Sequence, residues 1–199
     1  MKLTPLSIEG AWRMDPRQHS DDRGMFLEWY RSDLFADAAG HPLRLAQANL
    51  ARSARNVLRG VHFAQVPPGQ AKYVICVSGE IVDVVVDVRV GSPTFGQWEA
   101  VRLDDTSFNA LYLGEGLGHA YCVLSESAVV AYLCSEGYQP GREFTVSPLD
   151  PQLAIDWPTG SPILSPRDAE APTLAEAAAA GILPVYADCM AYTTSLRSR

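Results

Sequence analysis

The sequence predicts an all-β protein, a double-sheet sandwich or jelly roll with a few helices at its edges. Between residues 82 and 90, valines occupy every second position, which is the period of a β-strand. Similar apolar runs recur between residues 45 and 135, and clusters of Gly, Ser and Pro separate them. Many short strands at short spacing are typical of a sandwich or a jelly-roll barrel.

The expected strands follow one another without an intervening helix. Ser78-Gly79-Glu80 joins the runs 73–77 and 82–90, which indicates a hairpin. Glycine-rich turns at 91–96 and 114–118 divide the later strands. Further strands are expected at residues 45–51, 57–63, 98–103, 109–113, 120–124 and 129–135.

Two helices are expected outside this core. Residues 32–39 begin with a capping serine and stop before Gly40. Thr173 and Glu176 form a capping-box pattern, and the alanines that follow run to Gly181. The chain therefore reads as one domain over residues 1–199, with a core at about 45–150 on which N-terminal strands and a C-terminal helical segment pack.

Composition narrows the class of function. A chain of 199 residues is long enough to bury a core without disulfides or metal. Its composition, 47% hydrophobic and 20% charged, is ordinary for a globular protein. A net charge of -7 opposes nonspecific binding to nucleic acid, so an anionic ligand would need local cations such as Arg52, Arg55 and Arg59. No apolar run could span a membrane, and residues 1–5 lack a signal-peptide pattern, so a cytoplasmic protein is expected.

The sequence gives little support to a metal site. None of the four cysteines is spaced as C-x-x-C, and most lie in apolar runs typical of buried thiols. Metal-binding jelly rolls commonly carry two histidines one residue apart, but Gly60 and Ala64 flank His62 at that spacing. A site made of His62, His119 and a carboxylate is the less favoured alternative. We expect neither metal nor cofactor.

One histidine and one lysine stand out. The stretch 58–63, Leu-Arg-Gly-Val-His-Phe, places His62 in a strand, and Lys72 follows ten residues later. Lys72 is one of only two lysines in a chain with 14 arginines. A histidine can take a proton near neutral pH, and an ammonium can stabilise negative charge as it develops. The pair indicates proton abstraction next to a carbonyl.

The side chains of Arg59 and His62 can lie on the same face of the strand only if the strand is irregular. Residues three apart lie on opposite faces of a regular strand. A bulge at Gly60 would bring both side chains to one face, and we expect one there.

Four further residues have an alternative structural reading. Tyr132 could donate a proton, although a strand tyrosine more often packs. Asp168 could fold back to hold His62, or it could be an ordinary loop aspartate. Gln47 and Asn49 share a strand face and need hydrogen-bond partners, which a sugar supplies.

Residues in turns could contact a ligand as well. Arg23, Phe26 and Glu28 could meet a phosphate, a ring and a hydroxyl, or they could form a charged turn before a strand. His119 follows glycines that allow close approach of a ligand, although an ordinary loop histidine is the alternative. Tyr138 offers a flat surface for a base or a sugar.

Taken together these motifs resemble the dTDP-4-dehydrorhamnose 3,5-epimerases and their relatives from antibiotic deoxysugar pathways. The resemblance covers roughly residues 5 to 186 in the expected order. It rests on Asp22-Arg23-Gly24 with Phe26 and Glu28, Gln47-Ala48-Asn49, the stretch 58–63, Gln70-Ala71-Lys72, His119-Ala120-Tyr121, Tyr132 with Tyr138 and Glu143, Asp150-Pro151, Ile155-Asp156-Trp157-Pro158, and Leu164-Ser165-Pro166-Arg167-Asp168.

The resemblance implies a metal-free, cofactor-independent cupin-type jelly roll that works as a homodimer with exchanged N-terminal strands. It implies epimerisation of dTDP-4-keto-6-deoxy-D-glucose at carbons 3 and 5 through an enolate. His62 would be the base held by Asp168, Lys72 would stabilise the enolate oxygen, and Tyr132 would be the acid on the opposite face. The ligand-binding positions would be Arg23, Phe26, Glu28, Gln47, Asn49, Arg59, His119, Tyr138, Glu143 and Arg167.

Three alternatives stay open at this point. The first is a single-site epimerase that acts at carbon 3 or carbon 5 alone. The second is a sugar-binding jelly roll without activity, against which the set His62, Lys72, Tyr132 and Asp168 argues, because binding alone needs no acid–base pair. The third is a metal-dependent cupin oxygenase.

Overall fold

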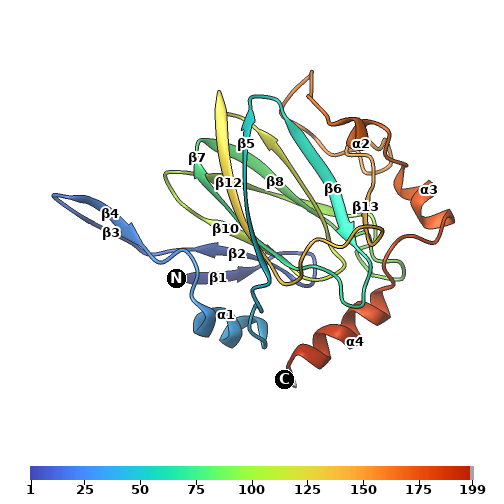
Figure 1. The fold of residues 1–199 in the computed structure, drawn as a ribbon, viewed down its shortest axis with the longest axis horizontal. Coiled ribbons are helices and arrows are strands. Elements are labelled where there is room, and N and C mark those ends of the chain that lie inside the picture. The colour runs from blue at the N-terminus through green and yellow to red at the C-terminus, as the bar shows by residue number, and fades with distance from the viewer. Residues whose placement is uncertain (198–199) are drawn as a thin grey trace.

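Two antiparallel sheets packed face to face form the body of the molecule, and the computed structural model describes residues 1–197 (Figure 1). The six-stranded sheet contains, in spatial order, β1 (Lys2–Pro5), β2 (Ala11–Asp15), β10 (Ala110–Leu113), β7 (Lys72–Ser78), β12 (Ser127–Cys134) and β5 (Gln47–Ala54). The five-stranded sheet contains β13 (Glu143–Thr145), β6 (Leu58–Ala64), β11 (Gly118–Val123), β8 (Glu80–Val86) and β9 (Trp98–Asp104). The predicted all-β, double-sheet fold is confirmed.

Both faces of the central strands are buried. Between the sheets, Val74 and Val130 of the six-stranded sheet pack in one cluster with Val85 of the five-stranded sheet. Because strand side chains alternate, the neighbours of these residues point outward and need cover of their own. Helix α1 (Ser32–Ala39) supplies it on the six-stranded sheet, and α3 (Leu174–Ala179) supplies it on the five-stranded sheet.

Both predicted helices form, but Ser32 does not cap α1. It is the first helical residue, and Arg31, which precedes it at the capping position, makes no side-chain capping hydrogen bond. Helix α1 ends at Gly40, whose φ of 80° is in the left-handed region that favours glycine. Both hydrogen bonds of the capping box between Thr173 and Glu176 are present at the start of α3. Two helices were not predicted, α2 (Pro166–Ala169) and α4 (Tyr186–Arg197). No helix among residues 1–197 is long and apolar enough to cross a membrane.

The valine-rich strand ends earlier than its pattern predicts. Strand β8 stops at Val86, although valines continue at every second position to Val90. The carboxylate of Asp87 accepts hydrogen bonds from the backbone and the side chain of Arg89, at 3.0 and 2.9 Å. This local pairing replaces the cross-strand ladder and turns the chain.

A hairpin of β3 (Gln18–Asp21) and β4 (Gly24–Leu27) projects away from the two sheets (Figure 1). The sequence does not predict β3, because all four of its residues are polar and exposed. Phe26 at the hairpin is 67% exposed, which is unusual for a phenylalanine in a folded chain.

Candidate active site

Arg59 and His62 lie on the same face of β6 because the strand bulges at Gly60. On the neighbouring β11, His119 pairs with His62 and Tyr121 pairs with Arg59, so two steps of one strand match three of the other. Gly60 has a φ of 122°, and a Cβ there would lie 2.5 Å from the backbone oxygen of His119. Only glycine fits this position, and the expected bulge is confirmed.

His62 is held by an aspartate from a distant part of the chain. Its Nε2 lies 2.7 Å from Oδ1 of Asp168, which is the contact expected from the sequence. Asp168 is in α2, whose capping residue Ser165 accepts a hydrogen bond from the Asp168 backbone. Burial raises the pKa of the Asp168 carboxyl, but hydrogen bonds from His62 and Ser165 outweigh it and leave that pKa below its usual value.

The imidazole of His62 is partly open to solvent, with about a third of its side chain exposed. Burial lowers its pKa, and the charge of Lys72 lowers it further, whereas the contact with Asp168 raises it. The pKa stays below the usual value, so the ring is neutral at neutral pH. With Nε2–H donated to Asp168, the lone pair on Nδ1 can accept a proton.

Lys72 and Tyr132 come from the opposite sheet. Lys72 begins β7, and burial lowers the pKa of its ammonium. Tyr132 packs against the cluster between the sheets, so its ring points inward and not to the outer surface. Burial raises the pKa of its phenol, which therefore keeps its proton at neutral pH and can donate it.

A row of amides and one arginine continues the site along β5. The amide of Gln47 donates to Asn49 Oδ1 at 2.8 Å, so both side chains share a face as predicted. Gln47 also accepts a hydrogen bond from the backbone of Tyr138, at 2.9 Å. From β6, Arg59 donates to Ser53 Oγ at 3.1 Å.

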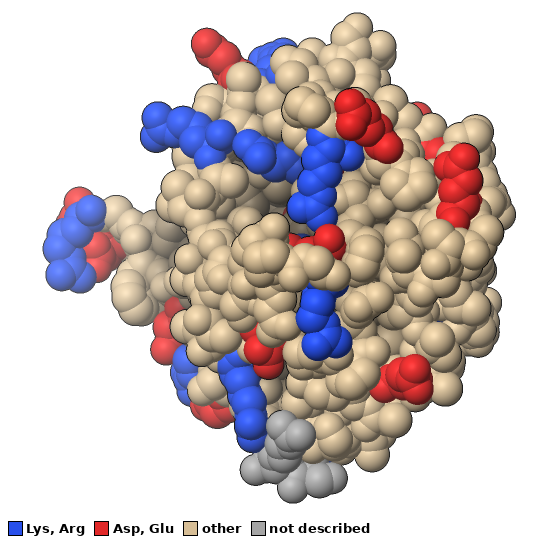
Figure 2. Space-filling model, turned by 45° about the vertical axis from the view of Figure 1, so that its right-hand side comes forward, with Lys and Arg blue, Asp and Glu red and all other residues tan. Residues whose placement is uncertain are grey.

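The charges of Glu143 and Arg167 both act on the pKa of Lys72. The guanidinium of Arg167 donates to the backbone oxygen of Glu143 at 2.9 Å. The side-chain amide of Gln70 lies 3.4 Å from the carboxylate of Glu143. The negative charge of Glu143 raises the pKa of Lys72, while Arg167 lowers it, although both effects are smaller than that of burial. On the face shown in Figure 2, basic side chains form a band with single acidic side chains between them.

Three predicted ligand-binding residues lie apart from His62 within one chain. Arg23 pairs with Asp21 at 2.6 Å in the turn of the projecting hairpin. Phe26 is exposed on β4, and the carboxylate of Glu28 pairs with Arg31 at 3.2 Å. The hairpin points away from the sheets, so a single chain does not bring these three groups to the His62 site (Figure 1).

Two buried acids belong to the site region and were not predicted. Asp83 is fully buried in β8, and its carboxylate lies 2.8 and 3.0 Å from Nε2 of His119. An aspartate inside a run of valines was the signal that could have found it. Glu115 accepts from Ser135 at 3.2 Å, and Ser135 in turn accepts at 2.8 Å from the backbone of Ala71, the neighbour of Lys72.

A histidine–aspartate pair, a half-buried lysine whose charge acts on that histidine, and an inward-packed tyrosine that keeps its proton lie inside an antiparallel jelly roll. These groups can move a proton on a carbon next to a carbonyl. Comparison with known proteins agrees with this chemistry. Residues 5–176 match the family described as dTDP-4-dehydrorhamnose 3,5-epimerase. The protein therefore belongs to the dTDP-4-dehydrorhamnose 3,5-epimerase family and is an isomerase.

Individual relatives are similar over almost their whole length. The chain is 61% identical to a dTDP-4-dehydrorhamnose 3-epimerase of Streptomyces niveus, covering 97% of this chain and 93% of the relative. It is 56% identical to a dTDP-4-dehydrorhamnose 3,5-epimerase of Mycolicibacterium smegmatis, covering 99% and 98%. A crystal structure of a 3'-monoepimerase from Streptomyces bikiniensis in complex with dTDP-quinovose superposes with a TM-score of 0.95 at 52% identity, covering 98% of this chain and 99% of the other.

Proposed function

We propose that the protein epimerises dTDP-4-keto-6-deoxy-D-glucose at carbons 3 and 5, without metal or cofactor. The observation that carries this proposal is the hydrogen bond between His62 and Asp168. Tyr132 packs inward from the other sheet, and Lys72 is close enough for its charge to lower the pKa of His62. Membership of the family supports the substrate class, since the relatives are named for dTDP-linked 4-keto sugars. Carbons 3 and 5 both adjoin the ketone at carbon 4, so one set of groups can serve both.

In this mechanism each carbon is inverted in two proton transfers. Nδ1 of His62 takes the proton from the carbon next to the ketone, and the electron pair of that bond moves into the enolate. The ammonium of Lys72 stabilises the negative oxygen. The phenol of Tyr132 then delivers a proton to the opposite face of the same carbon, and solvent restores both side chains.

The remaining groups would bind and orient the substrate. Arg59 reaches the diphosphate from the bulged strand, where its guanidinium matches phosphate geometry. Gln47 and Asn49, already aligned on one face, hydrogen-bond the sugar. His119, Glu143 and Arg167 contact the ligand from the other strands and from α2, and Tyr138 lies against the sugar or the thymine.

We further propose a homodimer in which the hairpin β3–β4 carries Arg23 and Phe26, with Glu28 just beyond it, into the partner's site. Two observations support this. The hairpin exposes Phe26 and Met25, at 67% and 41%, although large apolar side chains favour burial. At its base, an apolar recess of about 310 Å³ is lined by Met25, Phe26, Leu27, Trp29, Ile75, Val77 and Phe108. The whole chain, residues 1–199, would act as one domain in the cytoplasm, with no nucleic-acid or membrane partner.

Inversion at a single carbon is the second candidate, since the relative from Streptomyces niveus is named as a 3-epimerase. NMR of dTDP-4-keto-6-deoxy-D-glucose incubated with the enzyme in D₂O separates the two. Deuterium and inversion at carbons 3 and 5 support the proposed function. Reaction at one carbon alone assigns the single-site activity, and exchange at neither carbon overturns both.

A further inference from the structure

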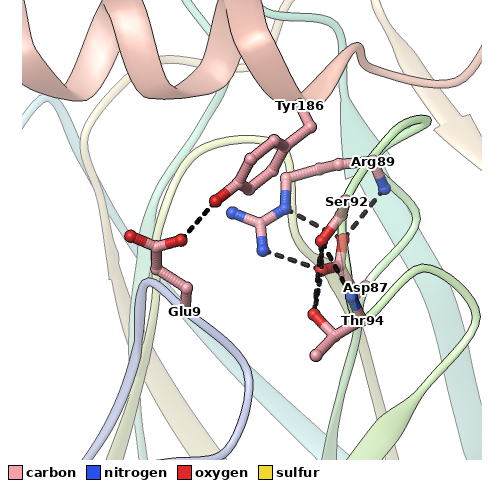
Figure 3. A network of polar contacts seen from close by, with 6 residues as sticks. All are labelled: Glu9, Asp87, Arg89, Ser92, Thr94 and Tyr186. Atoms are coloured by element: carbon pink, nitrogen blue, oxygen red, sulfur yellow. Dashed lines mark hydrogen bonds and ion pairs between the residues drawn. The ribbon is translucent and has the colours of Figure 1, made fainter.

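Two aspartates interrupt the run of valines at residues 82–90, and both are fully buried. One of them, Asp87, finds its partners in its own loop (Figure 3). Its carboxylate accepts hydrogen bonds from the backbone and the guanidinium of Arg89, and from the hydroxyls of Ser92 and Thr94. Because these bonds satisfy the carboxylate, the fold alone accounts for Asp87.

The other aspartate, Asp83, depends on a single histidine. It lies two residues from Ile81 and Val85, which pack between the sheets, so its side chain points into the same interior. Its Oδ2 lies 3.0 Å from Nε2 of His119 in a hydrogen bond. Its Oδ1 lies 2.8 Å from the same nitrogen but makes no hydrogen bond with any of residues 1–197. A buried carboxylate with so few donors costs free energy, so the fold alone does not account for Asp83.

The partner of Asp83, His119, lies beside His62. The two histidines are directly opposite each other on neighbouring strands. Side chains of such a pair share a face, with their Cβ atoms about 4.5–5.5 Å apart. A sugar placed for proton abstraction by His62 therefore lies close to the ring of His119.

The contact with Asp83 decides which ring nitrogen of His119 a ligand meets. An ionised carboxylate only accepts hydrogen bonds, so Nε2 carries the hydrogen in this contact. The other nitrogen, Nδ1, makes no hydrogen bond with residues 1–197, and it keeps accessible surface, unlike Oδ1 of Asp83. A ligand can therefore reach Nδ1 of His119, whereas Asp83, at 0% exposure, is out of its reach.

We propose that Asp83 is a positioning residue for the epimerisation. It fixes the hydrogen of His119 on Nε2 and leaves Nδ1 to meet the sugar beside His62. Asp83 acts through His119 and does not contact the substrate, which agrees with its complete burial. The effect on the reaction rests on the proposed function, whereas the orientation of the ring does not.

NMR of the protein labelled with ¹⁵N-histidine tests the orientation directly, because the ring ¹⁵N shifts distinguish the two tautomers. The chain has four histidines, and His119→Gln assigns the signal of His119 by its loss. In the unaltered protein at neutral pH we expect Nε2 of His119 to carry a hydrogen. An amide can donate as well as accept, so Asp83→Asn should move part of the population to the Nδ1–H tautomer.

Rates of proton exchange at the sugar, measured as kcat/KM in D₂O, test the effect on the reaction. Asp83→Asn should lower kcat/KM about 10–10²-fold, the range of a lost hydrogen bond to a charged group. His119→Gln should lower it as well. The double variant should fall no more than about twofold below the lower single variant, since both changes break the same contact. A small residual effect is expected because the charge of Asp83 also raises the pKa of Lys72, less than Cys134 and Glu143 do.

Asp150→Asn is the matched control. Asp150 is also buried, but its carboxylate accepts from the backbone N–H groups of Gln152 and Leu174, outside the space between the sheets. This change should leave the His119 signal and kcat/KM unaltered. Urea denaturation shows whether each variant is folded, and the spectrum of the unaltered protein tests the orientation whatever the stability of a variant.

A hydrogen on Nε2 in the unaltered protein, together with non-additive losses of rate, supports the proposal. Three results overturn it: the Nδ1–H tautomer in the unaltered protein, a folded Asp83→Asn variant with full kcat/KM, or losses in the two single variants that add in the double variant. Absence of proton exchange in the unaltered protein would instead overturn the proposed function, and the spectrum would still decide the orientation of His119.

Discussion

The protonation state of His62 decides which chemistry the site can perform. Burial and the nearby Lys72 both favour the neutral ring, whereas Asp168 favours the charged one, and the balance leaves its pKa below the usual value. Only a neutral imidazole can take a proton from carbon. The two neighbours therefore oppose each other, and removing them should move the pH dependence in opposite directions.

The pH profile of kcat/KM tests this balance. Activity should rise with pH through the His62 pKa, so the acid limb should lie below pH 6.5, the usual value of a histidine. Asp168→Asn removes the group that raises this pKa, so the limb should move to lower pH, while the plateau falls because the ring loses its orientation. Lys72→Met removes a cation that lowers it, so the limb should move to higher pH, with a plateau about 10²–10³-fold lower.

Shifts of the two variants in the same direction would contradict this account of the site. A limb that moves in neither variant would show that another group titrates. Circular dichroism of both variants across the pH range is the control for unfolding.

At the scale of the element, the bulge in β6 depends on one glycine. Gly60→Ala would place a Cβ 2.5 Å from both the His119 oxygen and the Ala120 Cβ, at a φ that side chains rarely adopt. We expect a loss of about 3 kcal/mol or more in the free energy of unfolding, since backbone strain of about 1–3 kcal/mol adds to the steric clash. Activity should fall with it, because Arg59 and His62 would no longer share a face. Urea denaturation and initial rates measure the two effects.

Gly91→Ala is the matched control for this prediction. Gly91 also has a positive φ, 86°, but its Cβ would meet nothing within 4 Å. It should therefore cost about 1 kcal/mol, which is the conformational part alone. If Gly60→Ala were no more costly than Gly91→Ala, close packing behind the bulge would not be what holds Arg59 and His62 together.

Elements with a buried, periodic pattern could be predicted, whereas exposed or mixed ones could not. Strands β7 and β12 have a clear sequence pattern because their apolar side chains pack on both faces. The polar β3 and the short β13 carry no such signal, and α4 has apolar and polar residues without a clear face. The end of β8 was mispredicted because the pattern of valines cannot show that Asp87 binds Arg89.

Individual residues of the candidate site could be predicted only where their residue type is unusual in the local sequence. His62, Lys72 and the pair Gln47–Asn49 are unusual in their strands, so the sequence singled them out as candidates. Asp83 was missed because its partner, His119, comes 36 residues later and only the fold brings them together. Whether Asp168 holds His62 could not be decided from 106 residues of separation, and the structure shows the contact.

At the scale of the whole molecule, the active site needs residues from both chains of the dimer if the hairpin β3–β4 reaches into the partner's site. Mixing two inactive variants tests this. One protomer carries His62→Ala, and the other carries Arg23→Ala with Phe26→Ala in the hairpin. In a mixed dimer, the intact His62 would be served by the intact hairpin of the other chain. Equal mixing after subunit exchange should restore about a quarter of the activity, since half of the dimers are mixed and each has one complete site.

The control for this mixing is the double hairpin variant combined with itself, which should stay inactive under the same exchange conditions. No recovery, in a mixture shown by mass spectrometry to contain mixed dimers, would mean that the hairpin does not complete the partner's site.

The central claim is that His62 removes a carbon-bound proton and Tyr132 returns one to the opposite face. Deuterium incorporation into dTDP-4-keto-6-deoxy-D-glucose, followed by NMR in D₂O together with the configuration of the product, tests it most directly. His62→Ala should show neither exchange nor inversion. Tyr132→Phe keeps the ring but loses the phenolic proton, so exchange should continue while inverted product falls sharply, by about 10²–10⁴-fold. Inversion at the unaltered rate in Tyr132→Phe, or exchange that survives in His62→Ala, would contradict the account.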